Sequence, residues 1–449
     1  MAKPPPLVAA PPRENPIDRA LGALSARDAD LALRAAAGAL KADLASPLAL
    51  LATGMALAAM GQSADARSAL ELAVDRAADG GNLPVALAAL AELHARGEDE
   101  GARVAAVTDA YGRGSPRLRA GAGAPPPSPR EVSPLPATLS GAALLTEAQG
   151  ALEYARASLE ADRSARGDAP QVPAHSLFSL FSAAALRALV ESVTVRLAAT
   201  GETVVAEGTP GADLFVVARG EVEVLRAADG PGAAPLLLAR LGAGAIFGEM
   251  AVLSRAPRAA SVVADRPTLL LVLPLTELGG IAARSPEVGK VLAAFAQKRM
   301  VANLVRTSVL LRPLSAQERQ ALIERFAPRT FEQGATLIQQ GREADGLHLV
   351  ASGQVAVVRR EGGENMVIAR LGVGEVVGEV SLVFRRPSNA SVVAEHPTLT
   401  LHLPRSRFLE IVREHPTLLA QLYALAVERD EETMDIASSD ATDADDLVI

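Results

Sequence analysis

The stretch FGEMAVLSRAPRAASV, from Phe247 to Val262, decides how the fold of this chain is interpreted. It joins a glycine turn, whose consecutive backbone N–H groups can point at one oxyanion, to a carboxylate (Glu249) and an arginine (Arg258). A carboxylate can accept hydrogen bonds from a sugar hydroxyl, and the planar fork of a guanidinium suits a phosphate. Together these features predict an anion-binding pocket.

A second copy of the stretch, VGEVSLVFRRPSNASV (Val377 to Val392), lies 130 residues further along the chain. It keeps the glycine, the glutamate and the proline, but Ser388 stands where the first copy has Arg258. A serine cannot neutralise a phosphate, so an anion buried there would lack a compensating charge. Arg386, two positions earlier, leaves a rearranged anion contact as the alternative. We predict a degenerate second site formed by Gly378, Glu379, Val380, Ser388, Asn389 and Ala390.

The first stretch resembles the phosphate-binding cassette of cyclic nucleotide-binding domains. That family includes protein kinase A regulatory subunits, bacterial catabolite activator proteins and cyclic nucleotide-gated channels. The flanking sequence is similar to the same family over about residues 175–430. The segments that carry this similarity are LFSLF (Leu177–Phe181), RLAATGETVVAEG (Arg196–Gly208), DLFVVARGEVEVL (Asp213–Leu225) and LARLGAGAIFGE (Leu238–Glu249).

The resemblance implies a role for each residue of the first cassette. Arg258 would pair with the cyclic phosphate, and Glu249 would hold the ribose 2′-OH. Alanine at position 259, where relatives that prefer cGMP often carry threonine, favours cAMP over cGMP. The ligand-binding residues predicted in this way are Phe247, Gly248, Glu249, Met250, Ala251, Pro257, Arg258, Ala259, Ala260 and Ser261.

Composition excludes several classes of protein. The net charge of −8 argues against a surface for nucleic acid, which normally carries basic excess. The absence of cysteine excludes disulfides and thiolate metal sites. The six histidines show no spacing typical of zinc enzymes, and we expect His396 and His402 to flank a strand. We therefore predict no catalytic residue, no metal and no cofactor other than the regulatory ligand, cAMP or cGMP.

Neither the start of the chain nor its most apolar segment predicts membrane insertion. Residues 1–15 lack the continuous apolar run of a secretory signal. The longest apolar run, Leu48 to Met60, is too short to span a bilayer and is interrupted by Thr53 and Gly54. We expect a soluble, cytoplasmic protein.

The chain before the first cassette is predicted to be helical. Residues 1–16 are proline-rich and expected to be disordered, and residues 17–111 are rich in alanine. Two blocks, Met60–Asp75 and Arg96–Tyr111, align at a spacing of 36 residues and resemble a tetratricopeptide repeat. Such repeats form a groove for a partner protein. The alternative is a plain bundle of helical hairpins.

The remaining boundaries follow from composition and periodicity. Residues 112–138 are a Pro/Gly-rich linker, and residues 139–165 are a connecting helix expected to dock on the first β domain or pair with another chain. Residues 174–308 and 309–430 would form two jelly rolls with flanking helices, and residues 431–449 a disordered acidic tail. The predicted fold class is α+β multidomain. Arg299, Met300 and Asn303 are candidates to cap a bound base.

The sequence best fits a cyclic nucleotide-responsive regulatory or adaptor protein and not an enzyme. The ligand would shift helices that control a partner bound at the N-terminal helices. A helix-turn-helix would be needed for a transcription factor, and an acidic segment of about twenty residues follows the second jelly roll instead. A kinase-inhibiting regulatory subunit is one alternative, although Arg117–Ala120 is a poor imitation of an Arg-Arg-x-Ser/Ala inhibitor sequence. A scaffold that binds no ligand is the other.

Overall fold

The computed structural model describes residues 15–119, 134–227, 234–253, 256–361 and 363–445. These residues form two compact units. The first comprises residues 1–206, 212–248 and 260–292, and the second comprises 207–211, 249–259 and 293–449. Each unit is described by itself. Within the described residues, no helix is long and apolar enough to cross a membrane.

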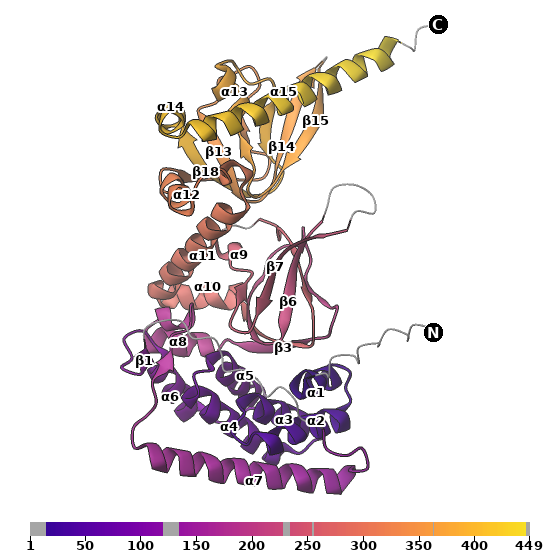
Figure 1. Ribbon diagram of the computed structural model, residues 1–449, viewed down its shortest axis with the longest axis vertical. Helices are drawn as coiled ribbons and strands as arrows, with labels where there is room; N and C mark the ends of the chain where they lie inside the picture. Colours follow the sequence, from indigo (N-terminus) through magenta and orange to yellow (C-terminus); the bar gives the residue numbers. More distant parts are fainter. Residues whose placement is uncertain (1–14, 120–133, 228–233, 254–255, 362, 446–449) are drawn as a thin grey trace, which may run out of the picture. The chain divides into compact units, whose positions relative to one another are not determined.

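The first unit begins with a bundle of helices (Figure 1). Side-chain caps mark the N-termini of four of these helices, as at Ser46, whose hydroxyl accepts the N–H of Ala49, with a proline following in the first turn. The helices are α1 (Pro16–Ser25), α2 (Ala29–Ala42), α3 (Pro47–Ala59), α4 (Ser63–Asp79), α5 (Leu83–His94) and α6 (Gly101–Tyr111). The predicted helical region is confirmed, whereas its assignment to the tetratricopeptide repeat stays a prediction.

Small residues bring α3 and α4 close together, as the repeat interpretation requires. A Cβ on Gly54 would lie 2.8 Å from Cγ of Leu70, so only glycine fits at this crossing without a shift of the leucine. Tyr111 closes the bundle, because its hydroxyl donates to the carbonyl of Ala78 at 3.1 Å and its ring is fully buried.

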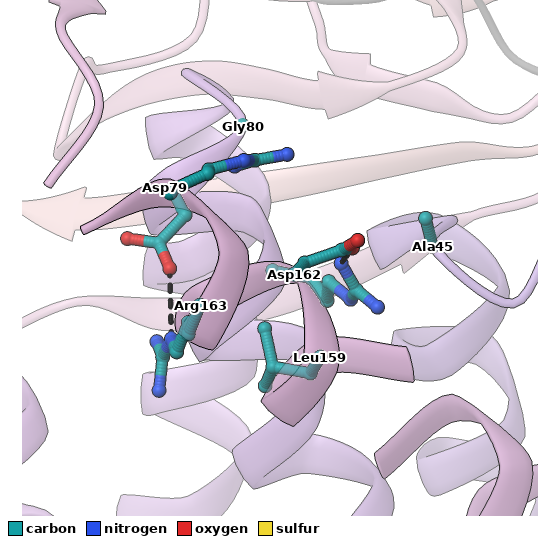
Figure 2. A pocket seen from close by; sticks show the side chains of 8 residues that line it. Ala45, Asp79, Gly80, Leu159, Asp162 and Arg163 are labelled. Carbon is teal, nitrogen blue, oxygen red and sulfur yellow. Dashed lines mark hydrogen bonds and ion pairs between the residues drawn. The ribbon is translucent and has the colours of Figure 1, made fainter. Parts of the chain in front are cut away.

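Helix α7 (Gly141–Arg166) lies along the bundle (Figure 1). Its apolar stripe is buried, and α7 packs against α2 and α4. Ion pairs line the α4–α7 seam: Nε of Arg163 donates to Asp79 at 3.0 Å, and Arg76 pairs with Asp162 (Figure 2). The prediction that this helix docks on the first β domain or pairs with another chain is therefore wrong. The small and apolar faces of α2 and α4, with their matching charges, accept the stripe instead.

Two helices of the bundle pack on the first β domain. Helix α5 contacts strands β3, β5 and β10, and α1 contacts β3 and β10. An ion pair anchors α1 there, because Nη2 of Arg219 lies 2.8 Å from Oδ1 of Asp18. Asp18 is a buried residue, with 7% of its surface exposed. The bundle is therefore part of the first unit and not a separately tethered module.

The first jelly roll has two four-stranded antiparallel sheets. Their orders are β3-β10-β5-β8 and β4-β9-β6-β7. The strand bounds are β3 Thr194–Ala198, β4 Thr203–Val205, β5 Asp213–Arg219, β6 Glu221–Arg226, β7 Leu236–Gly242, β8 Ile246–Phe247, β9 Ser261–Ala264 and β10 Thr268–Pro274. The flanking helices are η1 Phe178–Leu180, α8 Ala183–Val190, α10 Leu275–Arg284 and α11 Pro286–Thr307.

The second jelly roll repeats this topology within the second unit. Its sheet orders are β11-β18-β13-β16 and β12-β17-β14-β15. The strand bounds are β11 Ala327–Phe331, β12 Thr336–Ile338, β13 Gly346–Ser352, β14 Val355–Glu361, β15 Glu364–Leu371, β16 Val376–Val377, β17 Ser391–Ala394 and β18 Thr398–Pro404. The helices are η2 Val309–Leu311, α12 Ala316–Ile323, α13 Glu379–Phe384, α14 Arg405–Glu414 and α15 Pro416–Asp445. The predicted α+β fold class with two jelly rolls is confirmed.

Two predicted boundaries differ from the structure. Helix α15 continues to Asp445, whereas the sequence predicted its end at Asp430 and a disordered tail after it. The stretch 431–445 contains neither glycine nor proline, so nothing in it breaks the helix. Part of the predicted linker 112–138 is also ordered, because β1 (Leu118–Arg119) pairs with β2 (Val172–Pro173). Residues 120–133 and all but the last two residues of 1–16 lie outside the described part.

Candidate functional site

The first cassette begins on strand β8. Phe247 is buried there, and its ring stacks on Phe215 of β5 with centroids 4.8 Å apart. Gly248 follows with φ +87°, a backbone conformation that side chains rarely tolerate. The glycine turn predicted from the sequence is therefore present in the first cassette.

Glu249 is buried, with 5% of its surface exposed, and helix α11 supplies its partner. Nε of Arg299, on α11, lies 3.5 Å from Oε1 of Glu249. Of the residues considered as base caps, Arg299 thus contacts the cassette glutamate. Met300 is 3% exposed in the core of the second unit and is not available to cap a base, and Oδ1 of Asn303 accepts from Arg306 at 3.2 Å.

Arg258 is held by its backbone. Its N–H donates to the carbonyl of Thr209, and its own carbonyl accepts from the N–H of Gly208, each at 2.8 Å. The residue is half-buried. This double hydrogen bond fixes the position from which the guanidinium extends.

The other predicted residues of the first cassette lie around these anchors. Met250 opens the short helix α9 (Met250–Leu253), which also contains Ala251. Pro257 and Ala260 are half-buried, Ala259 is exposed, and Ser261 begins β9. The side chain of Ala251 lies outside what the structure describes.

The second cassette has the same backbone frame. Gly378 has φ +94°, and a Cβ there would lie 2.5 Å from the carbonyl oxygen of Gly346. Ser388 makes the double hydrogen bond that Arg258 makes, with the N–H of Gly341 and the carbonyl of Arg342, each at 2.8 Å. Ser388 therefore occupies the same structural position as Arg258. Its hydroxyl donates to the carbonyl of Ala390 at 2.8 Å.

The glutamate–arginine pair is also repeated. Glu379 is 2% exposed, and Nη1 of Arg429, on α15, donates to its Oε1 at 2.9 Å. Arg429 follows Arg299 by 130 residues, the same spacing that separates the two glutamates. That spacing is visible in the sequence, and it could have identified both arginines as equivalent partners of the cassettes.

A carboxylate from α15 engages the second cassette at the positions where the two copies differ. Oδ1 of Asp430 accepts from Nδ2 of Asn389 at 2.9 Å, and Arg386 forms an ion pair with the same oxygen. The guanidinium of Arg386 also lies 5.1 Å from the ring centroid of Phe384. Asp430 thus engages the two side chains that replace Ala259 and Ala256 of the first copy. The sequence analysis missed it because its counterpart in the first copy is the apolar Met300.

The histidines predicted to flank a strand divide into two cases. His396 lies between β17 and β18, as expected. His402 lies inside β18 and is 2% exposed, so the prediction is wrong for this residue. Both faces of β18 are covered, because its first six residues, His402 among them, are all buried.

Comparison with known proteins finds a matching family model and several relatives of this chain. A family model described as cyclic nucleotide-binding domain matches residues 195–285 and 328–415. The cAMP-dependent protein kinase regulatory subunit of Yarrowia lipolytica is 30% identical over 220 residues, which are 49% of this chain and 54% of that protein. The cAMP-dependent protein kinase type II regulatory subunit of Drosophila melanogaster is 32% identical over 149 residues, 33% of this chain and 37% of that protein.

A bacterial structure is also similar in sequence. The catabolite activator protein of Thermus thermophilus is 33% identical, with 30% of this chain and 62% of that chain covered and a TM-score of 0.27. A TM-score of this size does not establish a common arrangement of the two chains. The chain spans about half, or less, of the length of the two curated relatives.

Proposed function

Because this chain carries two cyclic nucleotide-binding domains, we propose that it is a regulatory protein controlled by one cyclic nucleotide per chain. The ligand binds at the first cassette, and the second cassette is degenerate. The protein does no chemistry itself and acts by changing the position of helices. Both curated relatives carry the name of regulatory subunits of a cAMP-dependent kinase, which supports this class of function.

The main support for the proposal is that equivalent backbone positions in the two cassettes carry different side chains. Arg258 and Ser388 make equivalent double hydrogen bonds to a glycine-containing turn. Only the arginine can supply the charge and the fork of N–H donors that a buried cyclic phosphate needs. In the first cassette, we in addition assign to the buried Glu249 the hydrogen bond from the ribose 2′-OH.

The contacts of Asp430 support a second cassette that binds no nucleotide. The carboxylate takes the side-chain donors of Asn389 and Arg386, which would otherwise be available to an anion. A nucleotide would have to displace this carboxylate without an arginine at position 388. The retained glycine turn is explained by the fold alone.

Ligand binding is proposed to change the position of helix α11. Arg299 joins this helix to Glu249, the residue proposed to bind the ribose. A ligand shifts an equilibrium only through different affinities for its two states. A ribose hydroxyl and the Arg299 guanidinium would share one buried carboxylate, so binding changes the interaction that holds α11.

We further propose that the ligand is cAMP. Ala259 supplies no hydroxyl for guanine, and both named relatives are cAMP-dependent. cGMP is the competing ligand that any test has to include.

A protein partner is proposed to bind the N-terminal helical region. The α2 and α4 face that a repeat groove would offer is covered by α7. We place the partner on the outer face of α7, where Tyr154 is 70% exposed. The relatives' names suggest a kinase catalytic subunit as one such partner. The segment Arg385–Ser388 (RRPS) matches the Arg-Arg-x-Ser pattern of a kinase inhibitor sequence, but the contacts of Arg386 and Ser388 hold it in the second cassette. The cytoplasmic location and the lack of nucleic-acid binding stay predictions from the sequence.

Isothermal titration calorimetry on the full chain tests the proposal. Titration with cAMP should give one site per chain, and cGMP should bind more weakly. Arg258→Ala should abolish binding, while the matched variant Ser388→Ala should leave both affinity and stoichiometry unchanged. Two equal sites, or unchanged binding in Arg258→Ala, would contradict the proposal.

A further inference from the structure

Three side chains with metal-binding atoms meet in the second jelly roll, away from the cassette. They are Asp345, His348 and His402, called the His–Asp cluster below. His348 lies on β13 and His402 directly opposite on β18, as register partners of an antiparallel pair. Asp345 immediately precedes β13. Neighbouring positions of this kind bring two Cβ atoms to about 5 Å, close enough for both rings to reach one point.

The distances within the cluster match those between the ligands of a shared cation, although His348 and Asp345 also form a long hydrogen bond of 3.3 Å. Nε2 of His348 and Nε2 of His402 each lie 3.3 Å from Oδ1 of Asp345. A charge-assisted N–H···O bond is shorter, at about 2.7–2.9 Å. A tetrahedral zinc ion with bonds of about 2.0–2.1 Å places its ligand atoms about 3.3–3.4 Å apart. All three candidate ligand atoms lie within 4.8 Å of one another.

One ring nitrogen of the cluster is buried without a hydrogen bond, although a carboxylate oxygen lies 3.3 Å away. His402 is 2% exposed, and its Nε2 has no hydrogen bond in the structure. Buried polar atoms are nearly always satisfied, so this nitrogen calls for a ligand that binds between the three side chains. The residue that follows Asp345 is Gly346, and a Cβ there would lie 2.2 Å from the carbonyl oxygen of Leu403 and 2.5 Å from Nε2 of His402, so glycine is needed where the imidazole packs on this backbone.

Further contacts orient the three ligands from outside. Nδ1 of His348 lies 3.1 Å from Oγ1 of Thr400, which leaves Nε2 as the ligand atom. Nη1 of Arg329 donates to Oδ2 of Asp345 at 2.7 Å, which leaves Oδ1 for the ion. Outer partners of this kind are typical of metal sites and fix the ring and carboxylate orientation. The charge of Arg329 also weakens the attraction of the carboxylate for a cation.

The first jelly roll shows that the fold does not need this polar cluster. The strands equivalent to β13 and β18 are β5 and β10, which occupy the same places in their sheet. Asp345, His348 and His402 correspond to Ala212, Phe215 and Val272 of the first jelly roll. Thr400 corresponds to Leu270. Apolar side chains therefore fill these places in an equivalent sheet.

We propose that the His–Asp cluster binds one divalent transition-metal ion, with zinc as the best fit. The ligands are the two Nε2 atoms and Oδ1 of Asp345. Imidazole and carboxylate donors in a tetrahedral set favour zinc over magnesium or calcium. Three protein ligands leave a fourth coordination position on the ion. We place this position on the solvent side of Asp345, whose side chain is 54% exposed. Water or a ligand from a partner would occupy it. The ion links β13 to β18, the strand that leads into α14.

Metal analysis of the full chain with zinc alone tests this site. The protein is freed of metal by a chelator, equilibrated with Zn²⁺ and measured by calorimetry and elemental analysis. Wild type should bind one zinc per chain. His402→Val, His348→Phe and Asp345→Ala each install the residue of the first jelly roll, and each should weaken zinc binding at least about tenfold. Thr400→Val should weaken it about tenfold, as loss of an outer contact does. His396→Asn is the matched control and should bind zinc like wild type.

Two further measurements, the melting temperature and the affinity for cAMP, test whether zinc binds at the cluster. Zinc should raise the melting temperature of wild type and of His396→Asn but not of His402→Val. Calorimetry with cAMP on the same variants should be unchanged, which separates this proposal from the proposed function. If His402→Val does not fold, Asp345→Ala decides, because its side chain is more than half exposed. Wild type that binds no zinc, or cluster variants that bind it like the control, would overturn the proposal.

Discussion

The two cassettes share one backbone and differ in the side chains that would meet an anion. Both have a glycine at positive φ, both hold the residue at the arginine position by a double hydrogen bond, and both bury a glutamate against an arginine from a later helix. Arg258 of the first cassette is Ser388 in the second, where Asp430 engages the neighbouring donors. The frame of a cassette is therefore a property of the fold, and anion binding is a property of a few side chains placed on it.

Giving the first cassette the serine of the second should have the largest effect. Arg258→Ser should weaken cAMP binding at least about thirtyfold, because removing one partner of a buried charge pair costs about 2–5 kcal/mol. Calorimetry measures the loss, and Ser388→Ala serves as the control. Binding within a factor of about three of wild type would mean that the cassettes do not differ at this position.

Removing the arginine of each glutamate pair should affect the second cassette more than the first. Glu379 pairs at 2.9 Å with Arg429, whose side chain is 19% exposed, whereas Arg299 is 40% exposed and lies 3.5 Å from Glu249. Arg429→Ala should lower the free energy of unfolding of the second unit by about 3 kcal/mol, because it leaves a buried charge alone. Arg299→Ala should cost about 1 kcal/mol or less.

Urea denaturation measures both losses. Adding Glu379→Gln to Arg429→Ala should restore at least half of the lost stability, because the neutral amide needs no cation. Equal losses for the two arginine variants, or no rescue by the amide, would contradict this difference between the pairs.

The reverse exchange should create a second site. Ser388→Arg combined with Asp430→Met gives the second cassette the arginine of the first and removes the competing carboxylate. We expect a gain in affinity at this cassette of at least about tenfold, one charge-assisted contact. The calorimetric stoichiometry should then move from one toward two per chain. Asp430→Met alone should still give one, and a second site in that variant would show that the carboxylate, and not Ser388, prevents binding.

The segments before the two jelly rolls should differ in their response to acid. Counting back from the capping serines Ser182 and Ser315, Ser308 takes the place of His175. Burial lowers the pKa of His175 to about 4, from 6.5. Its Nδ1 faces the N–H groups of Leu177 and Phe178 at 3.3 Å, so a proton there would oppose both.

This pKa sets the direction of the pH dependence. Above pH 6.5 the imidazole is neutral in the folded and unfolded chain, and it has no effect on stability. As the pH falls from 6.5 to about 4, the unfolded chain takes up a proton that the fold excludes. The free energy of unfolding should then fall by up to about 1.4 kcal/mol per pH unit, relative to His175→Ser. Denaturation of both proteins across this range measures the difference, and parallel curves would contradict it.

Much of the fold could be predicted because its signals are local. A glycine at a turn, a proline after a capping serine and alternation along a strand act over a few residues, so the cassettes and strand frame were visible in the sequence. The partners of Glu249 and Glu379 were not predicted, because each lies 50 residues away and only the repeated spacing of 130 residues links the two arginines to the cassettes. The docking of α7 on α2 and α4 was wrongly predicted, because an apolar stripe shows that a helix is buried but does not identify what buries it.

The sequence by itself determined two glycine-framed β-rolls, an alanine-rich helical region before them, and an arginine in one roll where the other has a serine. Only the tertiary structure decided that α7 covers the helical bundle, that Asp430 engages the second cassette, and that His348 and His402 meet beside Asp345. The physical reason is one of range. Backbone geometry and charge are properties of short segments, whereas the partner of a buried side chain depends on which distant segments pack against it.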